Sequence, residues 1–263
     1  MYKFNILDQT INLNQDIMSS LYNEDYGRKI DHVFKWLIDY NFDYKGSIFD
    51  VGSNVGLYSL AYQVIFPKSK VFSFEASDKL FQLLNSNINS NKPIGDKIET
   101  VNLAISNQKG LLEFGYPTPE QHPRYDNEKN IINPGLISAQ SIGKKSFVVD
   151  SISLDEFVLE KNIDKVDFIK IDVEGHEYQV LTGAIETIKE FSPVIIFEYN
   201  EITQNLSNFT LDSYLEFIYQ IKYDVYGLKY GWASKLEKLD LSSRNIKKEL
   251  KAFSDLVIFP SNN

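Results

Sequence analysis

The stretch that decides the fold is S-I-F-D-V-G-S-N-V-G, residues 47–56. Its first half is rich in apolar, strand-favouring residues, and it opens directly into the apolar helical pattern of residues 57–65. Gly52 and Gly56 give the backbone room to turn and let a ligand come close, while the first helical turn offers free N–H donors. The stretch predicts a strand, a tight turn and a helix, with a ligand at the turn; an ordinary tight connection is the alternative.

Strands and amphipathic helices alternate along the rest of the chain. The alternation predicts an α/β fold with a doubly wound, mostly parallel sheet and any antiparallel strand at its end. We expect strands at residues 70–76, 98–105, 147–149, 166–173 and 194–197 and near the C-terminus, a hairpin turn at 107–110, and helices at 23–40, 77–91, 153–159, 174–188 and 211–218.

The chain divides into two parts by pattern. Residues 1–45 are expected to form an arm and a helix packed on the main domain, and the first twenty or so of them have no clear period. Residues 46–263 form the main domain. Prolines and glycines interrupt the insertion at about 115–146, for which we expect a loop on the substrate side.

Composition excludes several function classes. The 263 residues are 43% hydrophobic, enough for a sizeable core. There is no cysteine, so disulfides, thiolate metal sites and cysteine nucleophiles are excluded. A formal net charge of −9 argues against nucleic acid as a partner. Without an apolar run of about 18 residues or a signal-peptide pattern, we expect no transmembrane segment and a soluble, cytoplasmic protein.

The residues around the turn favour S-adenosylmethionine (SAM) as its ligand. Glu75 lies about 20 residues beyond Gly56, where such folds place a carboxylate on ribose hydroxyls. A dinucleotide pyrophosphate needs G-x-G-x-x-G, but Ser53 and Asn54 occupy the middle of this turn. SAM has no phosphate, and Asp50 can meet its ammonium group directly or through water.

The motifs D-V-G-S-N-V-G, F-E-A-S, N-L-A-I-S, L-D-E-F, F-I-K-I-D-V-E-G-H-E-Y-Q-V-L and P-V-I-I-F-E follow one another between residues 47 and 200. In this order they resemble the FkbM family of SAM-dependent methyltransferases. The resemblance implies a seven-stranded class I methyltransferase sheet with an N-terminal helical extension. It also implies O-methyl transfer to hydroxyls of sugars or natural products, with Asn102 and Ala104 on the cofactor side.

Acidic and basic side chains are most concentrated at the end of the strand expected at residues 166–173 and directly after it. Asp172, Glu174 and His176 cluster at the carboxyl end of this strand, where the fold brings the methyl donor. We expect His176 or Asp172 to act as base, with Glu174 and Glu177 positioning the substrate or the imidazole. Alternatively, the two glutamates only complement a helix N-terminus.

Other candidates are a metal site and substrate contacts. Asp172, Glu198 and Asn200 follow adjacent strands and resemble the set that holds magnesium in catechol O-methyltransferases; Mg²⁺ is the alternative to a metal-free site and is not favoured. For substrate contact we name Glu177 and Glu198 at the strand ends and, in the insertion, Arg124 and Tyr125.

The expected acceptor is a small-molecule or nucleotide-linked sugar of bacterial surface polysaccharide, such as capsule or lipopolysaccharide. The Asn-, Lys- and Phe-rich composition suggests a bacterium with an AT-rich genome. Two alternatives stay open. One is an NAD-dependent nucleotide-sugar oxidoreductase or epimerase, for which Tyr125 and Lys129 have the Tyr-x-x-x-Lys spacing. The other is a methyltransferase-like protein that binds a partner without catalysis.

Overall fold

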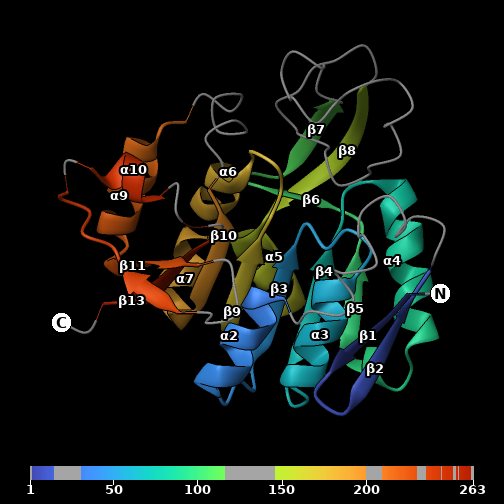
Figure 1. Ribbon diagram of the computed structural model, residues 1–263. Coiled ribbons are helices and arrows are strands. Elements are labelled where there is room, and N and C mark those ends of the chain that lie inside the picture. Colours follow the sequence, from blue (N-terminus) through green and yellow to red (C-terminus); the bar gives the residue numbers. More distant parts are fainter. Residues whose placement is uncertain are drawn as a thin grey trace, which may run out of the picture.

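The computed structural model describes residues 2–14, 31–115, 146–199, 209–229, 235–243, 245–250, 253 and 255–261 (Figure 1). An eight-stranded sheet in the order β12-β11-β13-β10-β9-β3-β4-β5 forms its centre. The neighbours from β10 to β5 are parallel, and β13, β11 and β12 add antiparallel strands at one end. These strands are β3 (Ser47–Val51), β4 (Lys70–Phe74), β5 (Ile98–Val101), β9 (Val166–Ile171), β10 (Val194–Glu198), β11 (Tyr223–Leu228), β12 (Leu236–Lys238) and β13 (Asp255–Pro260).

The expected doubly wound, mostly parallel sheet with antiparallel strands at its end is confirmed. It has one strand more than the seven expected, because the short β12 extends the edge beyond β11. The described helices are α2 (His32–Tyr40), α3 (Leu57–Ile65), α4 (Asp78–Ser90), α5 (Leu154–Lys161), α6 (Glu177–Thr182), α7 (Ile185–Phe191), α9 (Leu211–Gln220) and α10 (Ile246–Leu250), with a 3₁₀ helix at Ile94–Lys97.

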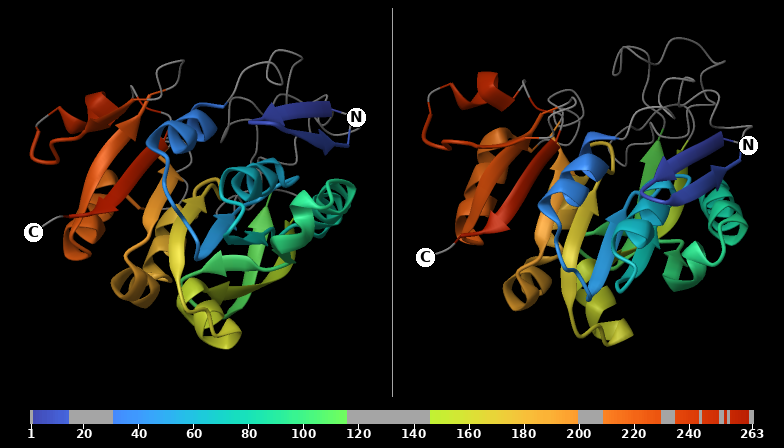
Figure 2. Two further views of the ribbon diagram at one scale, coloured as in Figure 1. Left: turned by 90° about the horizontal axis from the view of Figure 1, so that it is seen from below. Right: turned by 60° about the horizontal axis from the view of Figure 1, so that its bottom comes forward.

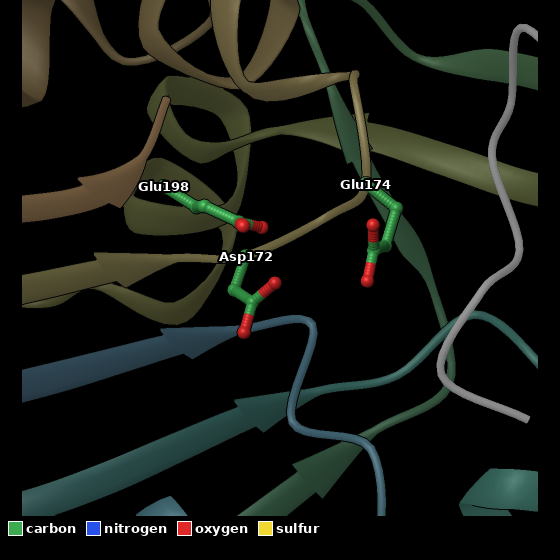
Figure 3. A group of neighbouring side chains, drawn as sticks. All are labelled: Asp172, Glu174 and Glu198. Atoms are coloured by element: carbon green, nitrogen blue, oxygen red, sulfur yellow. The ribbon is translucent and has the colours of Figure 1, made fainter. Parts of the chain in front are cut away.

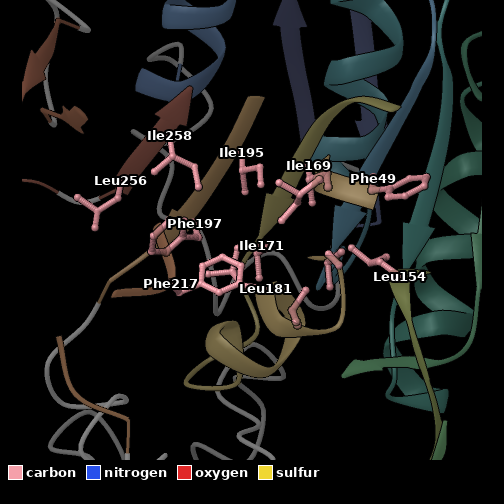
Figure 4. Close-up of a cluster of buried hydrophobic side chains, with 14 of the residues drawn as sticks. Phe49, Leu154, Ile169, Ile171, Leu181, Ile195, Phe197, Phe217, Leu256 and Ile258 are labelled. Carbon is pink, nitrogen blue, oxygen red and sulfur yellow. The ribbon is translucent and has the colours of Figure 1, made fainter. Parts of the chain in front are cut away.

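Two hydrophobic cores lie on opposite faces of this sheet, because successive side chains of a strand point to opposite sides. Ile48 of β3 packs with the apolar residues of α2, α3 and α4. Phe49, the next residue, belongs to the core under α5, α6, α7 and α9, part of which Figure 4 shows. The views in Figure 2 show the helices on both sides of the sheet.

A second sheet of three strands changes one expectation. β6 (Ala104–Ser106) and β7 (Gly110–Gly115) both pair with β8 (Ser146–Ser153), which lies between them. The predicted hairpin at residues 107–110 is therefore wrong. The single strand predicted at 98–105 is wrong as well, because the chain leaves the main sheet after β5 and enters the small one at β6.

The N-terminus also differs from the expected irregular arm. β1 (Tyr2–Ile6) and β2 (Gln9–Leu13) form an antiparallel hairpin that packs against α3 and α4. The Asn12 N–H donates to Asn91 Oδ1 at 2.7 Å, and the Asn91 amide donates back to the Asn12 carbonyl at 2.7 Å. Apolar and polar residues alternate here in only two runs of five residues, a pattern too short to distinguish a strand from an irregular segment.

The helix predicted at residues 174–188 is two helices, α6 and α7, separated at Gly183. A Cβ at this glycine would lie 2.0 Å from the carbonyl oxygen of Ser106, so close approach of β6 requires glycine here. Of the helix predicted at 23–40, the part from His32 onward is described and confirmed, with Asp31 as its N-cap. None of the helices that the structure describes combines the length and apolar character needed to span a bilayer.

Candidate functional site

The predicted ligand turn connects β3 to α3, and two glycines allow it to pack against its neighbours. Gly52 and Gly56 have φ values of +79° and +88°. A Cβ at Gly52 would lie 1.9 Å from the carbonyl oxygen of Asp172, and one at Gly56 would lie 2.6 Å from Leu84. Close packing of the protein is therefore sufficient reason for both glycines, and their predicted role in admitting a ligand stays a prediction.

Glu75, which follows β4, holds this turn in place. Its carboxylate accepts the N–H of Asn54 at 2.9 Å and the N–H of Ser77 at 2.9 Å. Burial raises the pKa of Glu75 to about 7, although the two N–H bonds oppose this. Each carboxylate oxygen has two lone pairs, so the group can still accept a ribose hydroxyl.

The remaining residues predicted on the cofactor side lie in the same region. The Ser53 N–H donates to the Phe74 carbonyl at 2.9 Å, which fastens the turn to β4. The Asn102 amide donates to the Glu75 carbonyl at 3.0 Å and so positions the chain after β4. Ala104 is buried at the start of β6. The structure thus places these residues around the carboxyl ends of β3 and β4.

Asp50 lies in β3 and is completely buried. Its Oδ2 accepts a hydrogen bond from the Ser59 hydroxyl of α3, and its Oδ1 lies 3.6 Å from Lys170 Nζ. Burial raises the pKa of Asp50, while Lys170 and Ser59 favour its ionised form. Because the carboxylate faces α3 and β9, its part in holding a ligand ammonium would be indirect.

Lys170 is the residue that the sequence analysis missed. It lies in β9, is 7% exposed, and its ammonium lies 3.2 Å from Asp172 Oδ2 as well as close to Asp50. It also donates to the Gly52 carbonyl at 3.3 Å. A lysine between apolar neighbours in a buried strand, two residues before an aspartate and hence on the same face, was the available signal.

Three carboxylates converge at the carboxyl ends of β9 and β10 (Figure 3). One oxygen from each of Asp172, Glu174 and Glu198 lies within 4.8 Å of the others, and the Asp172 side chain is 43% exposed. Glu198 lies beside Asp172 because Phe197 and Ile171 pair in register. Such a set of oxygen donors suits Mg²⁺.

The structure therefore brings together two members of the predicted metal set, Asp172 and Glu198, and adds Glu174. The third predicted member, Asn200, lies outside the described residues, as do Arg124 and Tyr125. Their predicted roles stay predictions.

His176 and Glu177 point into the protein. His176 is 5% exposed, and its Nε2 lies 2.9 Å from the Ser106 hydroxyl of β6. Burial lowers its pKa to about 4, so the imidazole is neutral at neutral pH. The Glu177 carboxylate is buried and accepts the N–H groups of Val173 and Gly175 at 3.0–3.2 Å, which closes the loop that carries Glu174.

The four predicted acids and bases thus fall into two groups. Asp172 and Glu174 stand at the open end of the sheet, whereas His176 and Glu177 are buried behind them. Of the two candidate bases, Asp172 is the one with an exposed side chain.

Comparison with known proteins identifies the family. A family model described as "Methyltransferase FkbM domain" matches residues 50–226, about two thirds of the chain. The hexuronic acid methyltransferase AglP of Haloferax volcanii is 30% identical over 149 residues, which cover 57% of this chain and 54% of AglP. The 2-O-methyltransferase NoeI of Sinorhizobium fredii is 25% identical over 158 residues, covering 59% and 63% of the two chains.

A solved structure, methyltransferase FkbM from Methylobacillus flagellatus, aligns with a TM-score of 0.49 at 15% identity and covers 82% of this chain and 44% of that one. The alignments span between about half and two thirds of the length of the curated relatives AglP and NoeI.

Proposed function

This chain belongs to the FkbM family of SAM-dependent methyltransferases, and within that family we propose that it transfers the methyl group of SAM to a hydroxyl of a sugar. The sugar we propose is a small-molecule or nucleotide-linked precursor of bacterial surface polysaccharide. The name of one relative, a hexuronic acid methyltransferase, supports a sugar acceptor, and the name of another, a 2-O-methyltransferase, supports transfer to oxygen.

The observation that carries this proposal is the meeting of the ligand turn with an open carboxylate. β3 and β9 are neighbouring parallel strands, so the turn that begins at Gly52 lies against the chain that begins at Asp172. Ligands of open α/β sheets bind outside the carboxyl ends of the strands. In our proposal SAM lies along the turn with its ribose on Glu75, and the acceptor approaches from the side of Asp172.

The reaction we propose is an in-line displacement. The acceptor oxygen forms a bond to the methyl carbon, the carbon–sulfur bond breaks, and its electron pair stays on sulfur in S-adenosylhomocysteine. The hydroxyl proton leaves to a base, which contributes on the order of 10²- to 10⁴-fold to the rate. Holding oxygen, carbon and sulfur in line contributes more, because the aligned pair reacts as a single molecule.

Asp172 suits the role of base better than His176. Asp172 is open to the proposed acceptor side, whereas His176 is buried and hydrogen-bonded to Ser106. Glu174 lies beside Asp172, and in our proposal it accepts hydrogen bonds from other hydroxyls of the sugar.

Mg²⁺ is the alternative partner of this cluster. Asp172, Glu174 and Glu198 would hold the ion, which would lower the pKa of a coordinated hydroxyl. Lys170, only 3.2 Å from Asp172, already supplies one positive charge there, and we therefore favour the metal-free reaction.

The test is a transfer assay with SAM labelled at its methyl group. UDP-glucuronic acid and UDP-glucose form a matched pair of acceptors, since they differ only at C6, which is a carboxylate in the first and a hydroxymethyl group in the second. Calorimetry should detect S-adenosylhomocysteine with a Kd in roughly the micromolar range. Transfer to a sugar hydroxyl supports the proposal. Binding of NAD but of neither adenosyl ligand, or transfer to RNA, protein or a lipid but to no sugar, would refute it.

A further inference from the structure

A row of polar side chains crosses the otherwise apolar face of the main sheet beneath α3. Ser73 of β4, Asp50 of β3 and Lys170 of β9 lie side by side in register. The Ser73 hydroxyl donates to Ser59 Oγ at 2.6 Å, and Ser59 donates to Asp50, which faces Lys170. The row ends at Asp172, the first of these side chains that opens to solvent.

Stability alone is a weak explanation for this row. Asp50 and Lys170 are 0% and 7% exposed, and burying such a pair costs about as much as its mutual attraction returns. The apolar residues that surround it, among them Ile48 and Phe168 on the same strands, would pack there without that cost. We therefore look for a function of the Asp50 and Lys170 charges in the site at the Asp172 end of the row.

Lys170 contacts both sides of that site. Its ammonium donates to the carbonyl of Gly52, the first residue of the turn at residues 52–56, which we call the donor turn because the proposed methyl donor lies along it. The ammonium also lies 4.9 Å from the ring centroid of Tyr58 in the first turn of α3. The same ammonium lies 3.2 Å from the exposed carboxylate of Asp172. One buried cation thus touches the donor turn and the carboxylate that faces the acceptor.

We propose that Lys170 is a positioning residue that fixes the donor turn and the Asp172 carboxylate relative to each other. This inference rests on the proposed function, because the alignment of donor and acceptor matters only for transfer between them. An in-line displacement loses rate steeply when one partner shifts. Because Lys170 contacts both groups, a substitution of Asp172 changes how Lys170 holds the donor turn. The affinity for the methyl donor therefore depends on Asp172.

The first test is a double-mutant cycle on S-adenosylhomocysteine affinity, measured by calorimetry and independent of the acceptor. Lys170→Met is expected to weaken binding at least about tenfold, because the turn loses a charged hydrogen bond. Asp172→Asn should change affinity several-fold when Lys170 is present and have no effect in the Lys170→Met protein. Lys170→Arg keeps the charge and should restore part of the affinity.

A second measurement separates positioning from folding. Thr187→Val removes a buried hydrogen bond of α7 outside the row, and urea unfolding shows which variants are matched in stability. With an acceptor from the transfer assay, Lys170→Arg should lower kcat more than it raises the KM for the acceptor, whereas Thr187→Val should leave both near the wild-type values. If Lys170→Met does not fold, the cycle is run with Lys170→Gln, which also removes the charge.

The outcomes are distinct. If the wild-type protein binds no S-adenosylhomocysteine, the proposed function fails. If it binds, but Asp172→Asn acts equally in both backgrounds, or the Lys170 variants lose activity only as far as they lose stability, the role of Lys170 is overturned and the proposed function stands.

Discussion

Replacing Glu75 by glutamine is expected to change how stability depends on pH. Burial raises the pKa of this carboxyl from 4.5 to about 7. Between these values the folded protein keeps a proton that the unfolded chain releases, so the folded state binds more protons and stability falls as pH rises. At about 1.4 kcal/mol per pH unit the full penalty above pH 7 is about 3 kcal/mol. Glutamine carries no such penalty.

The assay is urea unfolding of the wild-type and Glu75→Gln proteins in steps from pH 4.5 to pH 8. His176 has the opposite effect on stability, because burial lowers its pKa from 6.5 to about 4. Between these values the unfolded chain binds the proton and the folded protein does not, so stability rises with pH up to about 6.5. Both proteins contain His176, so the difference between their unfolding free energies isolates Glu75. The exposed Glu186→Gln is a matched control whose profile should run parallel to that of the wild type.

The expected result is a difference that moves by about 3 kcal/mol in favour of the glutamine variant from pH 4.5 to pH 7. Parallel profiles across this range would refute the raised pKa. If Glu75 also accepts the ribose hydroxyls, the affinity of the wild-type protein for S-adenosylhomocysteine should fall below pH 7, where the carboxyl gains its proton.

Three further changes test the loops and the cluster. Glu177→Gln should cost about 2–4 kcal/mol in urea unfolding, because a buried carboxylate that accepts two backbone N–H groups loses its charge; an unchanged midpoint would contradict its anchoring role. Gly52→Ala should destabilise by about 3 kcal/mol or more, since its Cβ would lie 1.9 Å from a carbonyl oxygen, and a soluble protein of wild-type stability would show that this contact relaxes freely. EDTA should leave the transfer rate unchanged in the metal-free reaction; loss of activity that Mg²⁺ restores in the wild type, but only at higher concentration in Glu198→Gln, would establish the metal alternative.

Local patterns were sufficient where one element or one turn carried the signal. The order of strands and helices follows from periods of two and 3.6 residues, and the turn at residues 52–56 is visible from its glycines. The small sheet is not visible in the sequence pattern because its pairing partners lie far apart in the chain, as β6 and β8 do, and leave no local trace. The N-terminal hairpin joins neighbouring strands, but each of them has only five residues, so its alternating pattern is too short to stand out.

The site shows the same division. Asp172, Glu174 and Glu198 were named from the sequence because polar residues at the ends of parallel strands meet at one edge of the sheet. Which way a side chain points from that edge depends on its surroundings. His176 and Glu177 are turned inward by Ser106 and by the N–H groups of their own loop, contacts that spacing along the chain does not reveal.

The sequence by itself determined the fold class, the turn at residues 52–56 and the strand ends where the chemistry is expected, since these depend on residues close together in the chain. Only the tertiary structure decided that Lys170 lies beside Asp50 and contacts both Gly52 and Asp172. The physical reason is the parallel pairing of β3 and β9. Their register places Asp50 and Lys170, more than a hundred positions apart in the chain, side by side. Because a buried charge is costly unless it is paired, the two side chains then interact with each other.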